Sequence, residues 1–312
     1  MARRVLITGA AGFAGSHLID LLAGDDEVHA WTRTTRRESP NRDVAWYQVD
    51  LMDRAGVDQA VAAIQPAVVF HCAGSPHVAS SWKDTATPLA QNVLGTHHLL
   101  DALRRVGRPC RVVIPGSATV YRSSSDPIPE SGAVAPISPY ALSKYAQELL
   151  GIRAVEEDGL EVVVTRSFNH TGPRQTAEFV APAFARQIAA IERGNSEPVI
   201  KVGNLDARRD ICDVRDVVRA YDALARHGVA GTVYNVASGT AHAMSDLLNG
   251  LLALSHTRIR IEQDPARMRP HDTPSLTGDA SRLRQATGWA PHIGWEQMLT
   301  DLLAYWRQQP LL

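Results

Sequence analysis

The feature that most constrains this chain is a regular alternation of short β-branched runs with longer helical patterns over its first half. The expected strands are residues 5–8, 27–32, 45–49, 67–72, 111–114 and 161–165, and the expected helices are residues 16–23, 57–64, 87–106 and 139–157. The strand runs are apolar at successive positions, which predicts a parallel sheet buried between two layers of helices. Right-handed crossovers then give a doubly wound α/β fold.

The regular alternation ends after Arg166. Glycine and proline punctuate shorter elements in the second half, and no serine- or glycine-rich linker separates the halves. We therefore expect a main domain over residues 1–166 and a smaller C-terminal lobe, mainly over residues 167–312, that packs tightly on it. Helical periodicity over residues 213–226 and 295–307 predicts that these two segments return to the main domain.

Composition excludes several classes of protein. The chain of 312 residues is 45% hydrophobic and has a formal net charge of −1, which excludes intrinsic disorder and argues against a nucleic-acid-binding surface. No run approaches the roughly 18 apolar residues that a membrane span requires. The three cysteines lack CxxC spacing and the histidines lack ligand spacing, so we expect a cytoplasmic protein with reduced thiols and no metal.

A glycine-rich turn follows the first expected strand. Gly9, Gly12 and Gly15 have the spacing GxxGxxG, and Phe13 and Ala14 stand between the last two glycines. Glycines at such a turn allow a pyrophosphate to approach backbone N–H groups, and the next helix points its positive end at the phosphates. The turn therefore predicts that the main domain is a dinucleotide-binding domain of the Rossmann type.

The end of the second expected strand indicates which dinucleotide binds. NAD sites place Asp or Glu about 20 residues after the glycines to accept from the ribose hydroxyls, whereas this chain has Thr32, Arg33 and Arg36 there. Guanidinium groups match the 2′-phosphate of NADP(H), so NADP(H) is favoured and NAD(H) is the alternative. Further cofactor contacts are expected where the third and fourth strands end, at Asp50, Leu51, Cys72, Ala73 and Gly74.

A tyrosine and a lysine stand four residues apart near the start of the helix expected over residues 139–157. Tyr140 and Lys144 therefore share one helix face. An ammonium group and an oxidised nicotinamide both favour a neighbouring phenolate, so we expect Lys144 and the cofactor to lower the pKa of Tyr140, and Lys144 also to hold the nicotinamide ribose. Ser117, after the fifth expected strand, can donate a hydrogen bond to the same substrate oxygen. These three residues are the predicted catalytic groups, and Tyr140 and Lys144 are also predicted to bind the cofactor.

The glycine turn, Ser117, Tyr140 and Lys144 together resemble the extended short-chain dehydrogenase/reductases, a family of NAD-dependent epimerases and dehydratases. The resemblance extends from Val5 to about Trp306. It implies a sugar-nucleotide substrate, hydride transfer at C4 of the hexose, and a homodimer joined through a four-helix bundle. The bundle helices would be those near residues 87–106 and 139–157.

The second half is similar to the GDP-4-dehydro-6-deoxy-D-mannose reductase branch of this family. The similar stretches are residues 166–175, 179–188 and 198–221. This resemblance implies reduction of the C4 ketone of GDP-4-dehydro-6-deoxy-D-mannose to GDP-D-rhamnose. It also implies that Asn169, Arg209 and Arg269 contact the diphosphate and that Arg186 and Val202 lie near the base.

Two other functions stay open. The run Ser117-Ala118-Thr119-Val120-Tyr121 is closer to UDP-glucose 4-epimerases, so a sugar-nucleotide 4-epimerase is the first alternative. A 4,6-dehydratase is disfavoured, because Ala118 and Thr119 cannot supply the acid and base of an elimination. The second alternative is a non-catalytic dinucleotide-sensing protein, which would have no need for Ser117, Tyr140 and Lys144 together.

Overall fold

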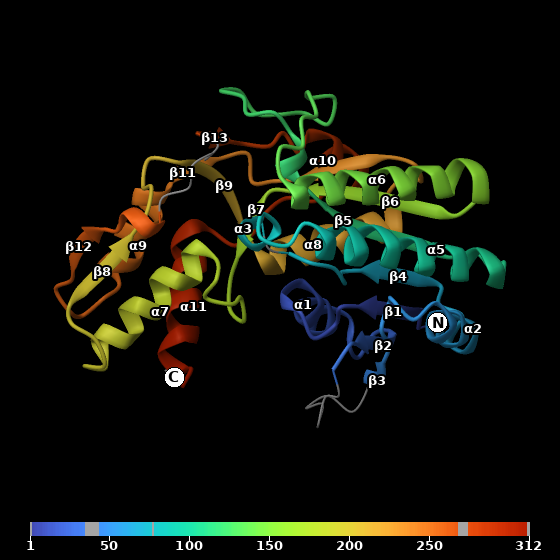
Figure 1. The fold of residues 1–312 in the computed structure, drawn as a ribbon, viewed down its shortest axis with the longest axis horizontal. Helices are drawn as coiled ribbons and strands as arrows, with labels where there is room; N and C mark the ends of the chain where they lie inside the picture. Colours follow the sequence, from blue (N-terminus) through green and yellow to red (C-terminus); the bar gives the residue numbers. More distant parts are fainter. Residues whose placement is uncertain (1, 35–43, 77, 268–273, 311–312) are drawn as a thin grey trace.

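A seven-stranded parallel sheet forms the centre of the molecule (Figure 1). The computed structural model describes residues 2–34, 44–76, 78–267 and 274–310. The strands of the sheet are β1 (Arg4–Thr8), β2 (Glu27–Thr32), β3 (Val44–Gln48), β4 (Val68–His71), β5 (Arg111–Ser117), β6 (Glu161–Ser167) and β10 (Val233–Val236). Their order is β10-β6-β5-β4-β1-β2-β3, and every pair is parallel. The predicted doubly wound fold is confirmed.

Two layers of helices cover the sheet. One face packs against α1 (Phe13–Leu22), α8 (Val214–His227) and α10 (Ser281–Thr287), and the other packs against α2 (Arg54–Ile64), α5 (Gly95–Val106) and α6 (Pro139–Asp158). Successive strand residues enter opposite layers: Val5 and Ile7 belong to the first, whereas Leu6 belongs to the second. This two-sided burial explains why the strands read as continuous apolar runs.

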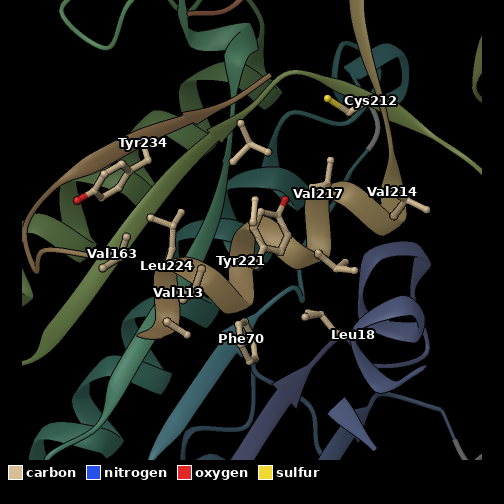
Figure 2. Close-up of a cluster of buried hydrophobic side chains, with 14 of the residues drawn as sticks. Leu18, Phe70, Val113, Val163, Cys212, Val214, Val217, Tyr221, Leu224 and Tyr234 are labelled. Atoms are coloured by element: carbon tan, nitrogen blue, oxygen red, sulfur yellow. The ribbon is translucent and has the colours of Figure 1, made fainter. Parts of the chain in front are cut away.

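Figure 2 shows the first of these layers, where α8 crosses the sheet. Tyr221 and Leu224 of α8 pack with Phe70 of β4 and Val113 of β5, and Leu18 of α1 joins the same cluster. Although α8 belongs to the second half of the chain, its apolar side is buried against the main sheet. The helix predicted over residues 213–226 therefore returns to the sheet as expected.

Three helices differ from their predicted form, and one of them, α2, begins at Arg54 instead of residue 57. Helix α1 begins at Phe13 instead of residue 16, since Gly12 already takes the cap position with extended backbone angles. The helix predicted over residues 87–106 consists of α4 (Ala86–Pro88), the π-helical segment η1 (Leu89–Leu94) and α5. The π-helical segment shifts the helix register by only a fraction of a turn. The apolar pattern of the sequence therefore does not reveal it.

A smaller lobe lies to one side of the sheet (Figure 1). Its own core joins α7 (Val180–Glu192), α9 (Met244–Ala253) and α11 (Trp295–Gln308) with β8 (Val199–Val202), which pairs with β12 (Arg260–Gln263). The prediction that residues 295–307 return to the main domain was wrong. Met298 and Leu302 of α11 are buried in the lobe, because the apolar side of this helix faces α7 and α9.

Short strands connect the lobe to the sheet. They are β7 (Asn169–Thr171), β9 (Arg208–Asp213), β11 (Ala241–Ala243) and β13 (Ser275–Leu276), with β9 at the centre. The remaining short helices are α3 (Val78–Ser81), η2 (Ala118–Val120) and η3 (Pro265–Arg267). None of the helices within the described ranges combines the length and apolarity that crossing a bilayer would need.

Candidate active site

The predicted cofactor turns lie at the point where the strand order reverses, between β1 and β4. Gly9 has a φ of +65°, and a Cβ placed on it would lie 2.6 Å from the backbone nitrogen of Ala73. Only glycine therefore lets the turn after β1 meet the turn after β4. The structure brings Gly9 together with the predicted cofactor residues Cys72, Ala73 and Gly74.

The glycine turn leaves the amino end of α1 open. A Cβ on Gly15 would lie 2.4 Å from the carbonyl oxygen of Gly9, so Gly15 permits close packing of the helix on the turn. Gly12 is exposed and gives the helix no side-chain cap, and no acidic residue stands in the first turn. Uncapped N–H groups and the helix dipole form a site for an anion, and these residues fit the pyrophosphate of a dinucleotide.

The residues predicted around the adenosine half lie at the ends of β2 and β3. Thr32 is buried at the end of β2, and Arg33 is exposed directly after it. Beyond β3, Asp50 accepts a hydrogen bond from the backbone of Met52, and the carbonyl of Leu51 accepts one from His98. Arg36 lies outside the described residues.

Ser117 and Tyr140 meet at the carboxyl end of β5. Tyr140 stands in the first turn of α6, which begins at Pro139 and is capped by Ser138 accepting from the N–H of Ala141. The Ser117 hydroxyl lies next to the phenol of Tyr140 and favours its charged form. A second hydroxyl, that of Thr119, lies 2.9 Å from the Ser117 oxygen. The structure thus brings together two of the three predicted catalytic groups.

The pKa of Tyr140 is dominated by burial. Burial raises it above the ordinary value, and the neighbouring Ser117 hydroxyl opposes this only in part. The predicted lowering by Lys144 and an oxidised nicotinamide together stays a prediction, and Lys144 is not among the groups that shift this pKa. The lysine Nζ donates to Gln147 on the next turn, while the buried phenol loses hydration of its charged form.

Lys144 is nearly buried, with 9% of its surface exposed. Burial lowers its pKa to about 8, and a thiol of high pKa, Cys72, lies near it at the end of β4. The lysine therefore shares the edge of the sheet with Cys72 and Tyr140, as the sequence predicts. Its partner Gln147 has no place in the predicted site.

Contacts between α1 and the segment after β7 join the cofactor turn to the second half of the chain. Phe13 stacks on His170 of β7, with ring centroids 5.8 Å apart. His17 lies 2.9 Å from the carbonyl oxygen of Pro173, and Arg174 pairs with Asp20 at 2.5 Å. Phe13 thus lies between the predicted phosphate site and the predicted substrate strand.

The predicted substrate residues lie in two groups. Asn169 is exposed on β7, which pairs with β9, the strand that carries Arg209. Arg186 is exposed on α7, whereas Val202 of β8 is only 1% exposed and packs in the core of the lobe. The expectation that Val202 lies near the base stays a prediction. Arg269 lies outside the described residues.

Sequence reasoning missed Asn92, a fully buried residue of η1. Its side chain accepts from the N–H of Ser75 at 2.8 Å and donates to the hydroxyl of Ser143 at 2.9 Å, so it joins the turn after β4 to α6. The only signal was a polar residue within a helical pattern. Among the described residues, no group of three or more His, Cys, Asp or Glu side chains could hold a metal.

These features define a class of protein: a Rossmann-fold oxidoreductase with a Ser–Tyr–Lys site beside its cofactor turn. The sequence model of the GDP-mannose 4,6 dehydratase family matches residues 6–302. The chain belongs to this family of NAD(P)-dependent sugar-nucleotide enzymes, which confirms the expected relationship to the extended short-chain dehydrogenase/reductases.

Three known proteins illustrate the relationship. The chain is 36% identical to the GDP-6-deoxy-D-mannose reductase of Pseudomonas aeruginosa over 99% of each chain. The solved structure of RMD from Pseudomonas aeruginosa, complexed with NADPH, superposes with a TM-score of 0.86 at 34% identity and covers 98% of this chain and 99% of that chain. The UDP-glucose 4-epimerase of Thermotoga maritima, solved with UDP-glucose, gives a TM-score of 0.88 at 26% identity, over 97% and 98% of the chains.

Proposed function

We propose that the protein reduces the C4 ketone of a GDP-4-dehydro-6-deoxy-hexose, converting GDP-4-dehydro-6-deoxy-D-mannose to GDP-D-rhamnose with a reduced nicotinamide cofactor. The observation that carries the proposal is that Ser117, at the end of β5, and Tyr140, in the first turn of α6, lie next to each other. The full-length similarity to a GDP-6-deoxy-D-mannose reductase supports the choice of substrate.

The site residues perform the proton chemistry of this reduction. When bound, the nicotinamide supplies the hydride that reduces C4. Tyr140 donates its phenolic proton to the ketone oxygen, so that hydride and proton together give the alcohol. Ser117 donates a hydrogen bond to the same oxygen and stabilises its developing negative charge. Burial keeps Tyr140 protonated, which is the form that a reductase requires.

NADPH is the favoured cofactor, and NADH is the alternative. Gly9, Gly12 and Gly15 would hold the pyrophosphate, and Lys144 would hold the nicotinamide ribose. Thr32 and Arg33 at the end of β2 offer no carboxylate to repel a 2′-phosphate. The presence of NADPH in the Pseudomonas aeruginosa structure supports this preference.

The smaller lobe, mainly residues 167–312, would bind the sugar nucleotide. Asn169 and Arg209, on the paired strands β7 and β9, would contact the diphosphate, and Arg269 is proposed to do the same. Arg186 on the exposed side of α7, and Val202 of β8, would lie near the base. An arginine next to a diphosphate gains charge-assisted hydrogen bonds that a neutral surface would not supply.

Exposed leucines support a homodimer. Leu89 and Leu94 of η1, and Leu142 and Leu149 of α6, are each more than two-fifths exposed although all four are large and apolar. These two elements pack against each other beside α5, so the leucines share one side of the molecule. We place the four-helix bundle there. A cytoplasmic location accords with three cysteines that are all free thiols.

A sugar-nucleotide 4-epimerase is the second candidate. The structural likeness to UDP-glucose 4-epimerase and the Ser117 to Tyr121 run favour it. The non-catalytic alternative is disfavoured because it would have no need for Ser117 next to Tyr140. A dehydratase is disfavoured because Thr119 offers a hydroxyl bound to Ser117 where an elimination would need an acid or base.

Purified protein separates these candidates in one experiment. It is incubated with GDP-4-dehydro-6-deoxy-D-mannose and NADPH or NADH, while the loss of nicotinamide absorbance is followed and the C4 configuration of the product is read by NMR. We expect one cofactor oxidised per sugar reduced and GDP-D-rhamnose as the product. A parallel incubation with UDP-glucose tests the epimerase. Interconversion there without net cofactor consumption, combined with no reduction of the ketone, would overturn the proposal.

A further inference from the structure

A buried row of polar side chains leads from Lys144 into the sheet. Lys144 Nζ donates to Gln147 Oε1, and Gln147 Nε2 donates to Thr96 Oγ1 at 2.7 Å. His71 Nε2 lies 2.8 Å from the same Thr96 oxygen, and Thr8 Oγ1 lies 2.8 Å from His71 Nδ1. Gln147 and Thr96 are fully buried, and Thr8 and His71 are 1% exposed. Polar groups at such depth are retained only when every one is hydrogen-bonded.

The direction of each hydrogen bond follows from Thr96. Its hydroxyl donates to the carbonyl oxygen of Asn92 at 2.6 Å, which uses its single hydrogen. Thr96 Oγ1 must therefore accept from both of its other neighbours, Gln147 Nε2 and His71 Nε2. The imidazole of His71 consequently carries its proton on Nε2.

The other nitrogen of His71 is then an acceptor. Thr8 donates its hydroxyl hydrogen to His71 Nδ1 and in turn accepts from the backbone N–H of Ala73 at 3.2 Å. Burial lowers the pKa of His71 to about 3, so the ring is neutral, as this pattern requires. The row ends at the turn after β4, at the backbone N–H of Ala73.

This arrangement fixes the amide of Gln147 in one orientation. A reversed amide would place its NH2 group against the ammonium of Lys144 and its oxygen against the lone pairs of Thr96. The row therefore aims the single side-chain acceptor of Gln147 at Lys144. Because Gln147 lies on the same helix as Lys144, the distance between its amide oxygen and the lysine is also fixed.

Few other groups near Lys144 can stabilise its charge. In the part of the chain that the structure describes, no carboxylate forms an ion pair with it. Cys72 has a pKa of about 12 and is a neutral thiol, His71 is neutral, and burial keeps Tyr140 protonated. The buried ammonium thus depends on an uncharged amide for its hydrogen bond.

We propose that Gln147 is a positioning residue: its amide oxygen, oriented by Thr96 and His71, holds the Lys144 ammonium at the carboxyl end of the sheet, where it faces the ribose of the cofactor. The inference rests on the proposed function for the role of Lys144, but the charge of the lysine can be tested without any sugar nucleotide.

The sequence offers a direct measurement, because the chain contains three lysines, Lys83, Lys144 and Lys201, of which the first and last are exposed. Cofactor-free protein is labelled with limiting acetic anhydride over a range of pH, and the acetylation of each lysine is read by peptide mass spectrometry. We expect Gln147→Met to lower the midpoint of Lys144 by about one pH unit, because a hydrogen bond to a charged group is lost. Gln147→Glu is expected to raise it by a similar amount or more, because it keeps an acceptor and adds a negative charge.

Two further variants keep the test sharp. Thr96→Val removes the group that orients the amide, and it should shift Lys144 in the same direction as Gln147→Met. Ser143→Ala removes a fully buried hydroxyl of α6 that hydrogen-bonds to Asn92 and to the carbonyl oxygen of Tyr140, and it should leave the lysine midpoint in place. Lys83 and Lys201 serve as internal references in every sample, and thermal unfolding verifies that each variant is folded.

The second readout is the affinity for NADPH, measured by fluorescence below and above the Lys144 midpoint. Gln147→Met should weaken binding several-fold, with the loss beginning at lower pH than in the parent protein, and Gln147→Glu should move that pH upward. Folded Met and Glu variants with the same Lys144 midpoint, or an equal shift in Ser143→Ala, would overturn the proposal. Neither measurement uses the sugar substrate, so an incorrect substrate assignment would not produce these failures.

Discussion

Tyr140 carries the proton of the proposed reduction on a single phenolic oxygen. Replacing Tyr140 with Phe keeps the ring in place and removes the hydroxyl that lies next to Ser117. We expect kcat to fall by about 10²–10⁴-fold, the usual contribution of a general acid, while the affinity for NADPH stays within a few-fold. Steady-state kinetics and fluorescence titration measure the two quantities.

Tyr145 provides the matched control, since it stands on the same helix and is partly buried in the core. Tyr145→Phe makes the same chemical change away from Ser117 and should retain most of the turnover. Comparable kcat values for the two variants would show that Tyr140 is not the acid.

The buried charge of Lys144 lowers the free energy of unfolding of the protein. Its pKa of about 8 in the folded protein lies below the ordinary 10.5, so the charged form is disfavoured by burial. This difference corresponds to about 3 kcal/mol at pH 7, and loss of the hydrogen bond with Gln147 offsets about 1 kcal/mol. We expect Lys144→Met to abolish turnover yet raise the free energy of unfolding of the cofactor-free protein by about 2 kcal/mol, measured by denaturant titration at pH 7.

The pH dependence of stability tests whether the Lys144 charge destabilises the folded protein. Between pH 8 and 10.5 the unfolded chain binds the lysine proton more than the folded chain, so the parent protein gains stability on this account as pH rises. The advantage of Lys144→Met should therefore shrink across that window. A variant that is less stable than its parent at pH 7 would contradict the assignment of Lys144 as a buried charge.

Two glycines in the unit formed by β1, the glycine turn and α1 are expected to have different roles. Gly12 would serve cofactor binding, and Gly15 would serve packing. A Cβ on Gly15 would meet backbone atoms of Gly9 and Ala10 at 2.4 Å and 2.8 Å, whereas a Cβ on Gly12 would approach only the carbonyl of Gly9, at 3.0 Å. We expect Gly15→Ala to lower the melting temperature clearly. Gly12→Ala should change it little and weaken NADPH binding about tenfold or more, because the methyl group occupies the exposed side of the turn.

Calorimetry and fluorescence titration of the two variants provide the comparison. Equal losses of stability in both would show that the turn serves packing alone. Unchanged NADPH affinity in Gly12→Ala would place the pyrophosphate elsewhere.

The sequence predicts the helices and strands themselves better than it predicts the contacts between them. The strands of the first half were found because both of their faces are apolar, and Ser117 and Tyr140 meet because β5 ends and α6 begins at the same edge of the sheet. The row behind Lys144 was not foreseen, because Gln147 and Thr96 stand on different helices and nothing in their spacing predicts contact. Burial of α11 in the lobe was equally hidden, since an apolar helix face does not state which neighbour covers it.

For the molecule as a whole, the exposed leucines of η1 and α6 determine the expected assembly. Leu142 and Leu149 are seven residues apart on α6, so they lie on one side of the helix, 50% and 49% exposed. A second copy that packs its own η1 and α6 against them would remove this apolar surface from water.

We expect Leu142→Glu combined with Leu149→Glu to convert a dimer into a folded monomer, because four buried and unpaired carboxylates would face one another across the two-fold axis. Light scattering coupled to size exclusion gives the mass of each species, and circular dichroism verifies the fold. Ile261→Glu, a charge placed on the 42% exposed Ile261 of the distant strand β12, is the control and should leave the mass unchanged. A monomeric parent protein, or a double variant that stays dimeric, would show that these helices do not form the interface.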